Sequence, residues 1–409
     1  MCSDRRYTML ITQAVILCGG LGSRLGDLTK DTPKPMMSLG EKSFLDHLIQ
    51  EISRYGFEEI LLLAGYHGDQ IYKKYNNTLI NGCNITVSVE PQLLGTAGCL
   101  HYSKDLLQDY FVLMNGDSWL DFDLLKIREI NDYPVNIVVK NSDNSYDCGV
   151  FTIEHDVVID FLEKSKLPVP GLINSGIYSF KKSVIMEYVT AGVPASLEKD
   201  VLPKLIKSNL VKAKIADNNS YFIDIGTPDR YEQSKISFVK ARTRPALFLD
   251  RDGTLNVDDG YTHRVSDLIW IDGAKDLIKH ANSIGMYVFV VTNQAGVAKG
   301  KYSKKEVDIF HKHMQNILNA EGAHIDAFEY CPHHPEGSVA EYAKICDMRK
   351  PNPGMILKLA SEWCVDLNNS LIIGDSDTDV IAGERAGIAG YKFSDKNLYD
   401  FFMGIKNDC

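Results

Sequence analysis

Short runs of apolar residues, many of them β-branched, alternate along the chain with stretches in which apolar residues recur at helical spacing. The apolar runs predict strands at Ala14–Leu17, Glu59–Leu63, Phe111–Met114, Val135–Val139, Ala246–Leu249, Tyr287–Val291 and Ser370–Ile373. Helical spacing separates many of these runs, as at Phe44–Tyr55 and Lys304–Ala320. Strands that alternate with helices are typical of an α/β fold with a largely parallel sheet.

The length of the chain indicates more than one domain. It has 409 residues, whereas a single hydrophobic core rarely grows beyond about 250–300 residues. The basic segment Ser234–Pro245 ends in Arg-Pro, directly before the strand predicted at Ala246. We therefore expect two domains, 1–240 and 246–409. Each is predicted to be a Rossmann-like, doubly wound α/β domain with a mainly parallel sheet.

Composition and charge exclude several classes of function. A formal net charge of -10 argues against a nucleic-acid-binding surface, and no apolar run reaches the ~18 residues of a membrane span. Arg5 and Arg6 before Met9–Ile11 loosely resemble a signal peptide, but Thr12 and Gln13 interrupt the apolar stretch. The nine cysteines lack the regular spacing of a disulfide scaffold. We therefore expect a reduced, cytoplasmic protein.

A glycine-rich loop follows the first predicted strand, in the sequence LCGGLGSRL at Leu17–Leu25. Gly19, Gly20 and Gly22 let the backbone approach a phosphate chain closely, and the amides of such a loop can bind anionic oxygens. Arg24 adds a cation at the end of the loop. By itself, the loop is equally compatible with a tight turn between a strand and a helix.

Further charged residues favour nucleotidyl transfer over a simple turn. Lys34 lies between two prolines, which limit the reach of its ammonium group. Asp117 and Asp224 each follow an apolar strand, where an open α/β sheet exposes ligand-binding groups. The two carboxylates can hold Mg²⁺, while Arg24 and Lys34 can neutralise charge on the phosphates. The substrate itself would supply the nucleophile.

The segment 14–41 resembles the signature of the sugar-1-phosphate nucleotidyltransferases, and similar motifs follow at Glu90–Gly98, Asn115–Asp117 and Asn174–Gly176. The resemblance covers about the first 235 residues. For the nucleotide, it implies binding by Gly19, Gly20, Gly22 and Arg24, contacts near the base from Gly95 and Thr96, and a phosphate contact from Lys34. It implies Mg²⁺ binding by Asp117 and Asp224. The sugar-phosphate pocket would be formed by Gly149, Glu163, Lys164 and Asn174. A lone polar residue such as Asn174 can also serve only to satisfy the backbone.

The second half begins with a carboxylate motif, FLDRDGTLN at Phe248–Asn256. Asp250 can attack a phosphoryl group and form an aspartyl-phosphate. Asp252 can protonate the leaving oxygen and later activate water. Thr292, Lys350 and Asp375 come from three later segments. Thr292 can form a hydrogen bond with the phosphate, and Lys350 can offset its charge. Asp375 can share Mg²⁺ with Asp250.

These four motifs resemble the haloacid dehalogenase superfamily of phosphatases. Within it, residues 246–395 look closest to the D,D-heptose 1,7-bisphosphate phosphatases, through Val291–Lys301, Tyr330–Val339 and Cys346–Met355. Histidinol-phosphate phosphatases are the alternative. The resemblance implies Asp250, Asp252 and Asp375 as Mg²⁺ ligands and Asn293 and Arg349 as substrate contacts. The short gap between Asp250 and Thr292 leaves no room for a large cap domain.

Members of this family often carry a structural zinc ion. The corresponding positions here are Cys331, His333, Cys346 and Met348. A thioether is a poor Zn²⁺ ligand compared with a thiolate, so the site is incomplete. His334, Asp347 or water could complete the tetrahedron, and zinc binding stays open.

The two halves suggest consecutive reactions. The phosphatase would remove the 7-phosphate of D-glycero-D-manno-heptose 1,7-bisphosphate. The transferase would then join heptose 1-phosphate to a nucleotide and release pyrophosphate. Because the N-terminal half most resembles heptose 1-phosphate guanylyltransferases, GTP is the expected donor. The alternatives are another sugar 1-phosphate together with histidinol phosphate, or one catalytically silent, regulatory domain. The expected partners are small molecules, without nucleic acid or membrane; a homo-oligomer is compatible with the sequence.

Overall fold

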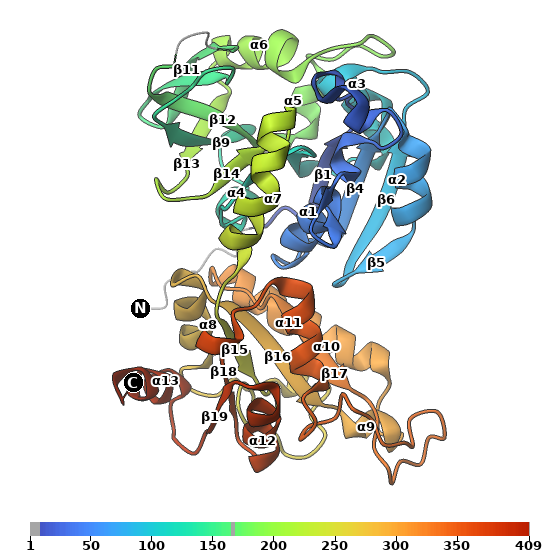
Figure 1. Ribbon diagram of the computed structural model, residues 1–409, viewed down its shortest axis with the longest axis vertical. Coiled ribbons are helices and arrows are strands. Elements are labelled where there is room, and N and C mark those ends of the chain that lie inside the picture. Colours follow the sequence, from blue (N-terminus) through green and yellow to red (C-terminus); the bar gives the residue numbers. More distant parts are fainter. Residues whose placement is uncertain (1–8, 165–167, 409) are drawn as a thin grey trace. The chain divides into compact units, whose positions relative to one another are not determined.

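The computed structural model describes residues 9–164 and 168–408, so Arg5 and Arg6 lie outside the described residues. The chain divides into two compact units (Figure 1). The first contains the described residues up to Ser53 together with Phe57–Phe238, and the second contains Arg54–Gly56 and the residues from Val239 onward. Both units are mixed α/β structures with substantial parallel sheet.

The described residues of the first unit form a ten-stranded sheet in the order β10-β11-β13-β9-β12-β7-β1-β4-β6-β5. The strands are β1 (Gln13–Cys18), β4 (Glu59–Ala64), β5 (Thr78–Ile80), β6 (Cys83–Val89), β7 (Tyr110–Asn115), β9 (Val135–Ser142), β10 (Val150–Glu154), β11 (Val157–Leu162), β12 (Gly171–Lys181) and β13 (Val211–Ile215). Strands β7, β1, β4 and β6 are parallel neighbours, and β12 runs antiparallel to both β7 and β9. The sheet is therefore mixed, where we expected a mainly parallel one.

The parallel centre of this sheet reflects the unbroken apolar runs in the sequence. Strands covered on both faces bury every side chain, so their sequences do not alternate between apolar and polar residues. The helices are α1 (Phe44–Ser53), α2 (Gly68–Tyr75), α3 (Gly95–Tyr102), α4 (Leu125–Arg128), α5 (Lys182–Met186), α6 (Leu202–Lys207) and α7 (Pro228–Arg242). Short pairs β2 (Ser38–Leu39) with β3 (Lys42–Ser43), and β8 (Ser118–Leu120) with β14 (Phe222–Asp224), complete the unit.

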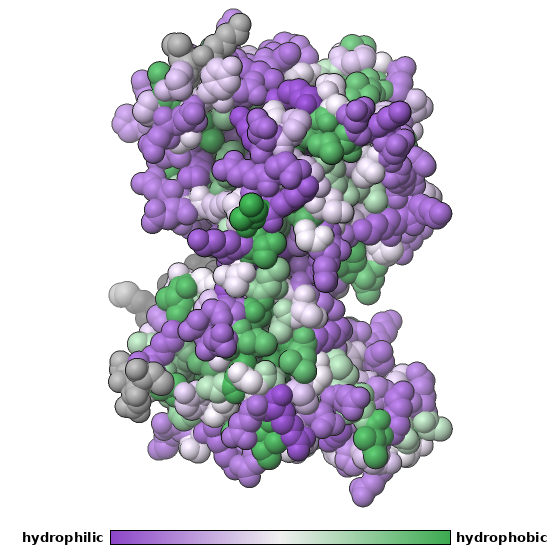
Figure 2. Space-filling model, viewed as in Figure 1, coloured by the Kyte–Doolittle hydropathy of each residue, from purple (hydrophilic) through white to green (hydrophobic). Residues whose placement is uncertain are grey.

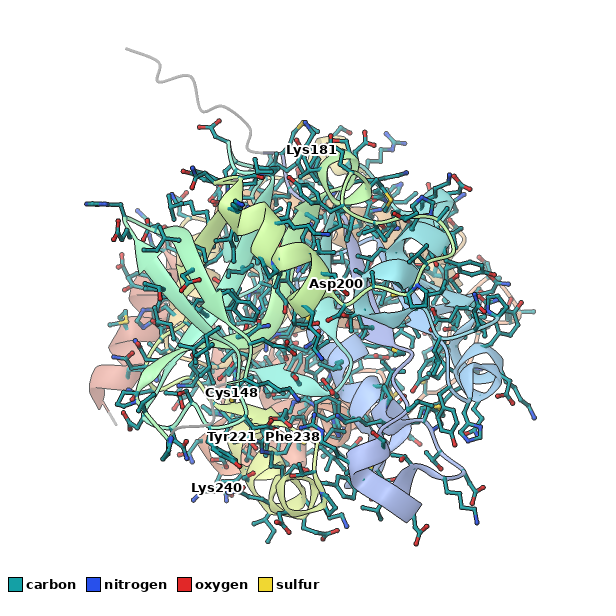
Figure 3. The ribbon with its side chains drawn as sticks, turned by 90° about the horizontal axis from the view of Figure 1, so that it is seen from above. Cys148, Lys181, Asp200, Tyr221, Phe238 and Lys240 are labelled. Carbon is teal, nitrogen blue, oxygen red and sulfur yellow. The ribbon has the colours of Figure 1, made fainter. Side chains whose placement is uncertain are left out.

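The segment expected to separate the domains is largely helical. Helix α7 continues through Ser234 and ends only at Arg242. Phe238, labelled in Figure 3, is buried on this helix. Its ring lies 5.9 Å from that of Phe44 and 4.9 Å from that of Trp119. A basic, polar sequence can thus form a helix that a buried aromatic side chain anchors, which composition alone does not reveal.

The second unit has a five-stranded parallel sheet, ordered β17-β16-β15-β18-β19 in the described chain. Its strands are β15 (Ala246–Leu249), β16 (Tyr287–Asn293), β17 (Ala327–Cys331), β18 (Leu371–Gly374) and β19 (Ala389–Lys392), and its helices are α8 (Ala274–Ser283), α9 (Ala295–Ala298), α10 (Lys304–Ala320), α11 (Gly354–Trp363), α12 (Asp377–Ala386) and α13 (Leu398–Asp408). Apolar clusters on both faces of the sheet form its core.

Parallel strands bring their carboxyl ends to one edge of a sheet, and this positions the candidate sites. In the second unit, β15, β16 and β18 end next to Asp250, Thr292 and Asp375. On the face seen in Figure 2, hydrophilic side chains cover most of the first unit, whereas the second unit shows a mixture of hydrophobic and hydrophilic side chains. Within the described residues, no helix combines the length and apolar character needed to cross a bilayer.

Candidate active sites

A cleft of about 370 Å³ lies in the first unit where β1 and β7 end. The glycine loop and the start of α3 form its walls. Its lining includes Gly19, Gly20, Lys34, Glu90, Gly95, Thr96, Asp117 and Glu198. The loop, the lysine and the first carboxylate expected from the sequence therefore converge on one cavity.

Lys34 and Asp117 form an ion pair in this cleft, with 2.5 Å between Nζ and Oδ2. Lys34 is buried in a short turn, Lys34–Met36. Burial disfavours the charged carboxylate of Asp117, but the ammonium of Lys34 outweighs it and lowers the pKa of Asp117, with help from the hydroxyl of Ser118. The contact with Lys34 thus favours the ionised form of the Asp117 carboxyl group.

Asp224 lies next to Asp117 because β14 pairs with β8 and places Asp224 opposite Ser118. The backbone N–H of Ile225 donates to the carbonyl oxygen of Asp117 at 2.9 Å. Arg230 donates to Oδ2 of Asp224 at 2.6 Å, and the N–H of Gly226 donates to Oδ1 at 2.9 Å.

The groups for phosphate chemistry surround Gly226. A Cβ atom on this glycine would lie 2.6 Å from Oδ1 of Asp224, 3.3 Å from Arg24 and 3.5 Å from Lys34. Only glycine therefore leaves this space free. Two carboxylates and two cations around one open position suit a polyphosphate with a divalent cation.

Gly95 and Thr96 begin helix α3 at the other side of the cleft. Gly95 has a φ of 75°, and a Cβ atom there would lie 2.5 Å from the carbonyl oxygen of Ala195. Thr96 donates to Glu198 at 3.0 Å and accepts from the N–H of Leu197 at 2.7 Å. Glu198, which the sequence did not single out, thus shares the wall with Thr96.

The residues expected around the sugar phosphate, Gly149, Glu163, Lys164 and Asn174, lie outside the lining of this cleft. Asp147 pairs with both Lys164 and Arg24. Nζ of Lys164 lies 3.7 Å from Oδ1 of Asp147, and the guanidinium of Arg24 donates to Oδ2 at 2.8 Å. Glu163 lies 3.7 Å from Lys199. The side chain of Asn174 donates to Tyr178 at 2.6 Å and accepts from Gly176, while its N–H donates to the carbonyl of Gly149.

In the second unit, Lys350 lies at the centre of a cluster of carboxylates. Its Nζ atom is 2.6 Å from Asp250 and 2.5 Å from Asp379, and it also donates to the carbonyl of Val291 at 2.6 Å. Oxygen atoms of Asp250, Asp375 and Asp379 lie within 4.8 Å of one another. Burial raises the pKa of Asp250 to about 7, against the opposing charge of Lys350 and with the support of Asp379.

This excess of negative charge suits a divalent cation. Burial, followed by the charge of Asp379, also raises the pKa of Asp375. One lysine cannot neutralise three neighbouring carboxylates, and oxygen ligands are what Mg²⁺ prefers. Gly253 has a φ of 82°, and a Cβ atom there would clash with the carboxylate of Asp375. The residues present therefore fit the predicted Mg²⁺.

Asp252 points into a separate hydrogen-bond network. Arg251 binds it with two hydrogen bonds of 2.9 Å, while Asn256 donates at 3.1 Å and Gln294 at 2.8 Å. Asp252 lies outside the group of carboxylates that could hold a metal ion among the described residues. The acid–base role and the ligand role expected for Asp252 both stay predictions.

Asn293 and Thr292 end strand β16 with different contacts. Asn293 uses its amide on the backbone of Lys350, donating to the carbonyl and accepting from the N–H at 3.0 Å each. It therefore holds the backbone of Lys350 in place. Thr292 is buried and accepts a hydrogen bond from Gln294 at 2.9 Å.

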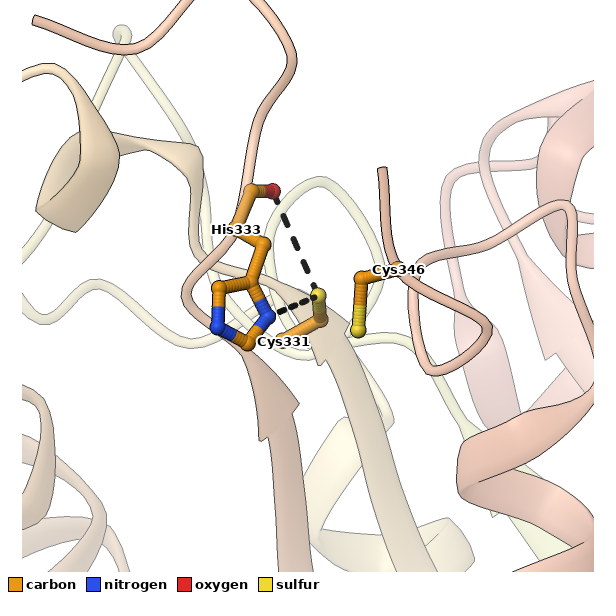
Figure 4. Close-up of side chains that lie close together, drawn as sticks. All are labelled: Cys331, His333 and Cys346. Atoms are coloured by element: carbon orange, nitrogen blue, oxygen red, sulfur yellow. Dashed lines mark hydrogen bonds between the residues drawn. The ribbon is translucent and has the colours of Figure 1, made fainter. Parts of the chain in front are cut away.

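The three predicted zinc ligands converge at the end of β17 (Figure 4). Their ligand atoms, from Cys331, His333 and Cys346, lie within 4.8 Å of one another, with 3.7 Å between the Cys331 sulfur and Nδ1 of His333. Burial raises the pKa of Cys331 to about 11. The backbone N–H of Met348 donates to the Cys346 sulfur at 3.4 Å, and its side chain packs against the apolar core. Arg349 donates to the carbonyl of His333 at 3.2 Å.

Asp379 is a further functional candidate that the sequence did not assign. It belongs to the run Asp375–Asp379 and is buried at the first turn of α12, where it accepts from the N–H of Ser376. A reciprocal capping pattern explains an acidic residue at that place. The sequence therefore offered a sufficient structural reason for Asp379, and only its contact with Lys350 indicates a second role.

Known proteins match each half of the chain. The nucleotidyl transferase family matches residues 13–238, and the HAD-hydrolase-like family matches residues 347–391. The C-terminal part is 46% identical over 163 residues to a D-glycero-beta-D-manno-heptose-1,7-bisphosphate 7-phosphatase of Rhodopseudomonas palustris, covering 40% of this chain and 90% of the relative. It is 42% identical over 143 residues to a D-glycero-alpha-D-manno-heptose-1,7-bisphosphate 7-phosphatase of Burkholderia mallei, covering 35% of this chain and 76% of the relative.

The N-terminal part is similar to a crystal structure of HddC from Yersinia pseudotuberculosis in complex with GMP-PN. The sequence identity is 31%, the match covers 56% of this chain and 100% of that chain, and the TM-score is 0.49. The first family covers more than half of the chain, and the Rhodopseudomonas phosphatase is matched over most of its length. The chain therefore belongs to the nucleotidyl transferase family and, through its C-terminal part, to the family of the heptose-1,7-bisphosphate 7-phosphatases.

Proposed function

We propose that this chain is a bifunctional enzyme that removes the 7-phosphate of D-glycero-D-manno-heptose 1,7-bisphosphate and then transfers a nucleotidyl group to heptose 1-phosphate. One observation carries the proposal. Each unit has its own set of carboxylates paired with a buried lysine, Lys34 with Asp117 in the first and Lys350 with Asp250 in the second. The first unit matches the nucleotidyl transferase family, and the second matches a heptose-1,7-bisphosphate 7-phosphatase.

The second unit acts first. Asp250 attacks the phosphorus of the 7-phosphate through a carboxylate oxygen, and the sugar oxygen leaves with a proton from Asp252. Water then attacks the aspartyl-phosphate and gives its proton to Asp252, which releases phosphate and restores Asp250. Lys350 offsets the charge of the phosphoryl group, and Thr292 donates a hydrogen bond to it. A bound Mg²⁺ would be held by Asp250 and Asp375 and would supply further charge neutralisation.

The first unit then uses the product. The 1-phosphate oxygen of the heptose attacks the α-phosphorus of a nucleoside triphosphate, and pyrophosphate leaves. Lys34 and Arg24 neutralise the phosphates, the amides of the Gly19–Gly22 loop bind their oxygens, and Gly95 and Thr96 lie near the base. Asp117 and Asp224 would hold Mg²⁺. Gly149, Glu163, Lys164 and Asn174 would line the pocket for the sugar phosphate.

We also propose finer features that support this function. GTP is the nucleotidyl donor, because the N-terminal half resembles guanylyltransferases. Each unit is doubly wound, with substrates at the carboxyl ends of the strands; the order β17-β16-β15-β18-β19 supports this for the second unit. Arg349 contacts the sugar, and Cys331, His333 and Cys346 bind zinc with one position left to another ligand.

The test uses crossed variants of the full chain, supplied with the bisphosphate, GTP and Mg²⁺. The wild type is expected to release phosphate and pyrophosphate and to form GDP-heptose, measured by chromatography. Asp250→Asn should lower phosphate release by about 10³-fold or more while retaining pyrophosphate release from added heptose 1-phosphate. Asp117→Asn should stop the reaction at heptose 1-phosphate. Unchanged bisphosphate with the wild type, or phosphate release by Asp250→Asn, would contradict the proposal.

Substrate identity needs its own comparison. Relatives act on either anomer of the heptose bisphosphate, so both anomers are assayed beside histidinol phosphate and other sugar 1-phosphates. We expect kcat/KM for one heptose anomer to exceed that for histidinol phosphate by about 10²-fold or more, because buried polar groups left without partners penalise the wrong ligand. A preference for histidinol phosphate would replace the heptose assignment and leave both reaction types in place.

A further inference from the structure

Gln294 is a buried residue to which the reaction steps above assign no role. It follows the end of strand β16, directly after Thr292 and Asn293, and its side chain is completely shielded from solvent. A buried amide must satisfy its donors and acceptors, so the hydrogen-bond partners of Gln294 indicate the role of its side chain.

The amide of Gln294 connects four groups around the phosphatase site. Its Nε2 atom donates to Oδ2 of Asp252 at 2.8 Å and to the hydroxyl oxygen of Thr292 at 2.9 Å. Its Oε1 atom accepts from the hydroxyl of Tyr302 at 2.7 Å and from Arg251 at 3.2 Å. Arginine can only donate, so the amide oxygen must face Arg251 and the amide nitrogen must face Asp252 and Thr292, which leaves one possible orientation.

This orientation has a consequence for Thr292. Because the hydroxyl oxygen of Thr292 accepts the N–H of Gln294, its own hydrogen stays available to donate to a phosphoryl oxygen. The same amide nitrogen holds Asp252, whose carboxylate is also bound twice by Arg251. One side chain therefore controls the direction of the phosphate-binding hydroxyl and of the acid–base carboxylate.

Tyr302 in turn holds Gln294 in place. Its ring packs so closely on Gly296 that a Cβ atom there would clash with it. Tyr302 is buried, and Arg251 is completely so, with its guanidinium 4.6 Å from the ring of Phe310. The frame around the amide is thus rigid, which suits a device that must aim two groups at once.

We propose that Gln294 is a positioning residue of the phosphatase, which aims the hydroxyl of Thr292 and the carboxylate of Asp252 at the phosphoryl group during its transfer. The inference rests on the proposed function of the second unit and deepens it. Gln294 itself does not touch the substrate; it acts through Thr292 and Asp252.

The experiment compares three variants of the full chain. Gln294→Glu keeps the shape and can still bind Arg251, but it replaces the N–H donors by an oxygen that repels Asp252. We expect kcat of phosphate release to fall about 10–100-fold with KM changed less than about 3-fold. Affinity for orthovanadate, measured with Mg²⁺ present, should fall in parallel, because vanadate mimics the transition state. Tyr302→Phe should lower kcat about 2–5-fold by loosening the amide.

Tyr287→Phe is the matched control. It removes a buried tyrosine hydroxyl that donates to the carbonyl of Arg242 at 3.0 Å, so it carries a similar stability cost without touching the network. We expect its kcat and vanadate affinity to equal those of the wild type. If Gln294→Glu does not fold, Tyr302→Phe decides the question against this control.

The possible outcomes separate this inference from the substrate assignment. Unchanged kcat and vanadate affinity in Gln294→Glu, or losses matched by Tyr287→Phe, would overturn the role of Gln294. If the wild type leaves the heptose bisphosphate intact but binds vanadate more tightly than Gln294→Glu does, the substrate assignment fails and the positioning role stands. If the wild type binds no vanadate and releases no phosphate, both fail.

Discussion

Single residues in this protein often serve two purposes, and Asp379 is an example. It caps helix α12 through the N–H of Ser376 and also pairs with Lys350 at the phosphatase site. The carboxylate cluster around Lys350 combines three acids with one base, so removal of any member changes the charge balance of the site. Such residues can be tested by isosteric substitutions that change charge without changing shape.

The substitution Asp379→Asn tests whether this residue supports the metal site. It retains the shape of the cap but removes one negative charge beside Lys350. We expect the Mg²⁺ concentration needed for half-maximal phosphatase activity to rise about 10–100-fold, the usual cost of losing an outer-shell partner. The measurement is a Mg²⁺ titration of phosphate release, with Ser376→Ala as a control that removes only a cap contact. An unchanged titration in Asp379→Asn would assign the residue to capping alone.

Met348→Cys tests the three-ligand zinc site. A thiolate at position 348 would supply a fourth strong ligand in place of a thioether. We expect zinc affinity, measured by competition with a chromogenic chelator, to rise at least about 10²-fold, an estimate from the preference of structural sites for four ligands. Met348→Leu, which changes the side chain without adding a ligand, should leave the affinity unchanged. Equal affinities in the wild type and Met348→Cys would mean that the side chain at 348 does not reach the metal.

Secondary-structure elements are set up by local polar contacts as well as by burial. Helix α1 begins with a reciprocal pair, in which Ser43 donates its N–H to Asp46 at 2.9 Å and accepts from the N–H of Asp46 at 3.2 Å. Helix α10 begins in the same way with Ser303 and Glu306. These caps explain why the helices predicted from apolar spacing begin where they do.

Asp46 makes the cap of α1 sensitive to pH. Burial opposes its charge, but Lys74, Ser43 and Tyr75 lower the pKa of Asp46 below its usual value. Its ionised form is therefore stabilised by folding. This contribution is fully present above the unfolded pKa near 4 and is lost as the pH falls through the lower folded pKa.

We accordingly expect Asp46→Asn to lower the free energy of unfolding by about 1 kcal/mol at neutral pH. The difference from the wild type should shrink as the pH is lowered below about 4. Urea unfolding of both proteins across this range measures it. Asp69→Asn, at the exposed first turn of α2, makes the same change in net charge and serves as the control. A gap that stays constant with pH would contradict the assigned role of the Asp46 charge.

At the scale of the whole molecule, the two reactions use separate sets of residues. The transferase site draws on β1, β7 and β14, and the phosphatase site draws on β15, β16 and β18. The product of the phosphatase is a stable sugar phosphate that can diffuse through water. Chemistry alone therefore does not require that both reactions occur in one copy of the chain.

A mixing experiment tests this independence. Asp250→Asn alone and Asp117→Asn alone should each yield no GDP-heptose from the bisphosphate. An equimolar mixture of the two should restore its formation to within about 2-fold of the wild type at the same concentration of active sites, since the intermediate is freely exchanged. A mixture that forms heptose 1-phosphate but no GDP-heptose would show that the intermediate must pass within one chain.

The sequence alone predicted much of the element pattern. The apolar runs at Ala246–Leu249 and Val135–Val139 are strands, and Lys304–Ala320 is a helix with those bounds. Continuous apolar runs and helical spacing are local properties, so they can be recognised without knowing the fold. The antiparallel strand β12 and the helical course of Ser234–Arg242 escaped prediction, because pairing direction and an aromatic anchor depend on distant partners.

The chemistry of the sites divides in the same way. The sequence by itself determined which residue types were present in which order, and this was enough to indicate two phosphate-handling sites and their families. Only the tertiary structure decided which groups meet: Lys350 with Asp379, Arg24 with Asp147, and Gln294 with both Thr292 and Asp252. The physical reason is that a motif records neighbours along the chain, whereas hydrogen bonds and ion pairs depend on distances of a few ångströms that arise when separate strands end at the same edge of a sheet.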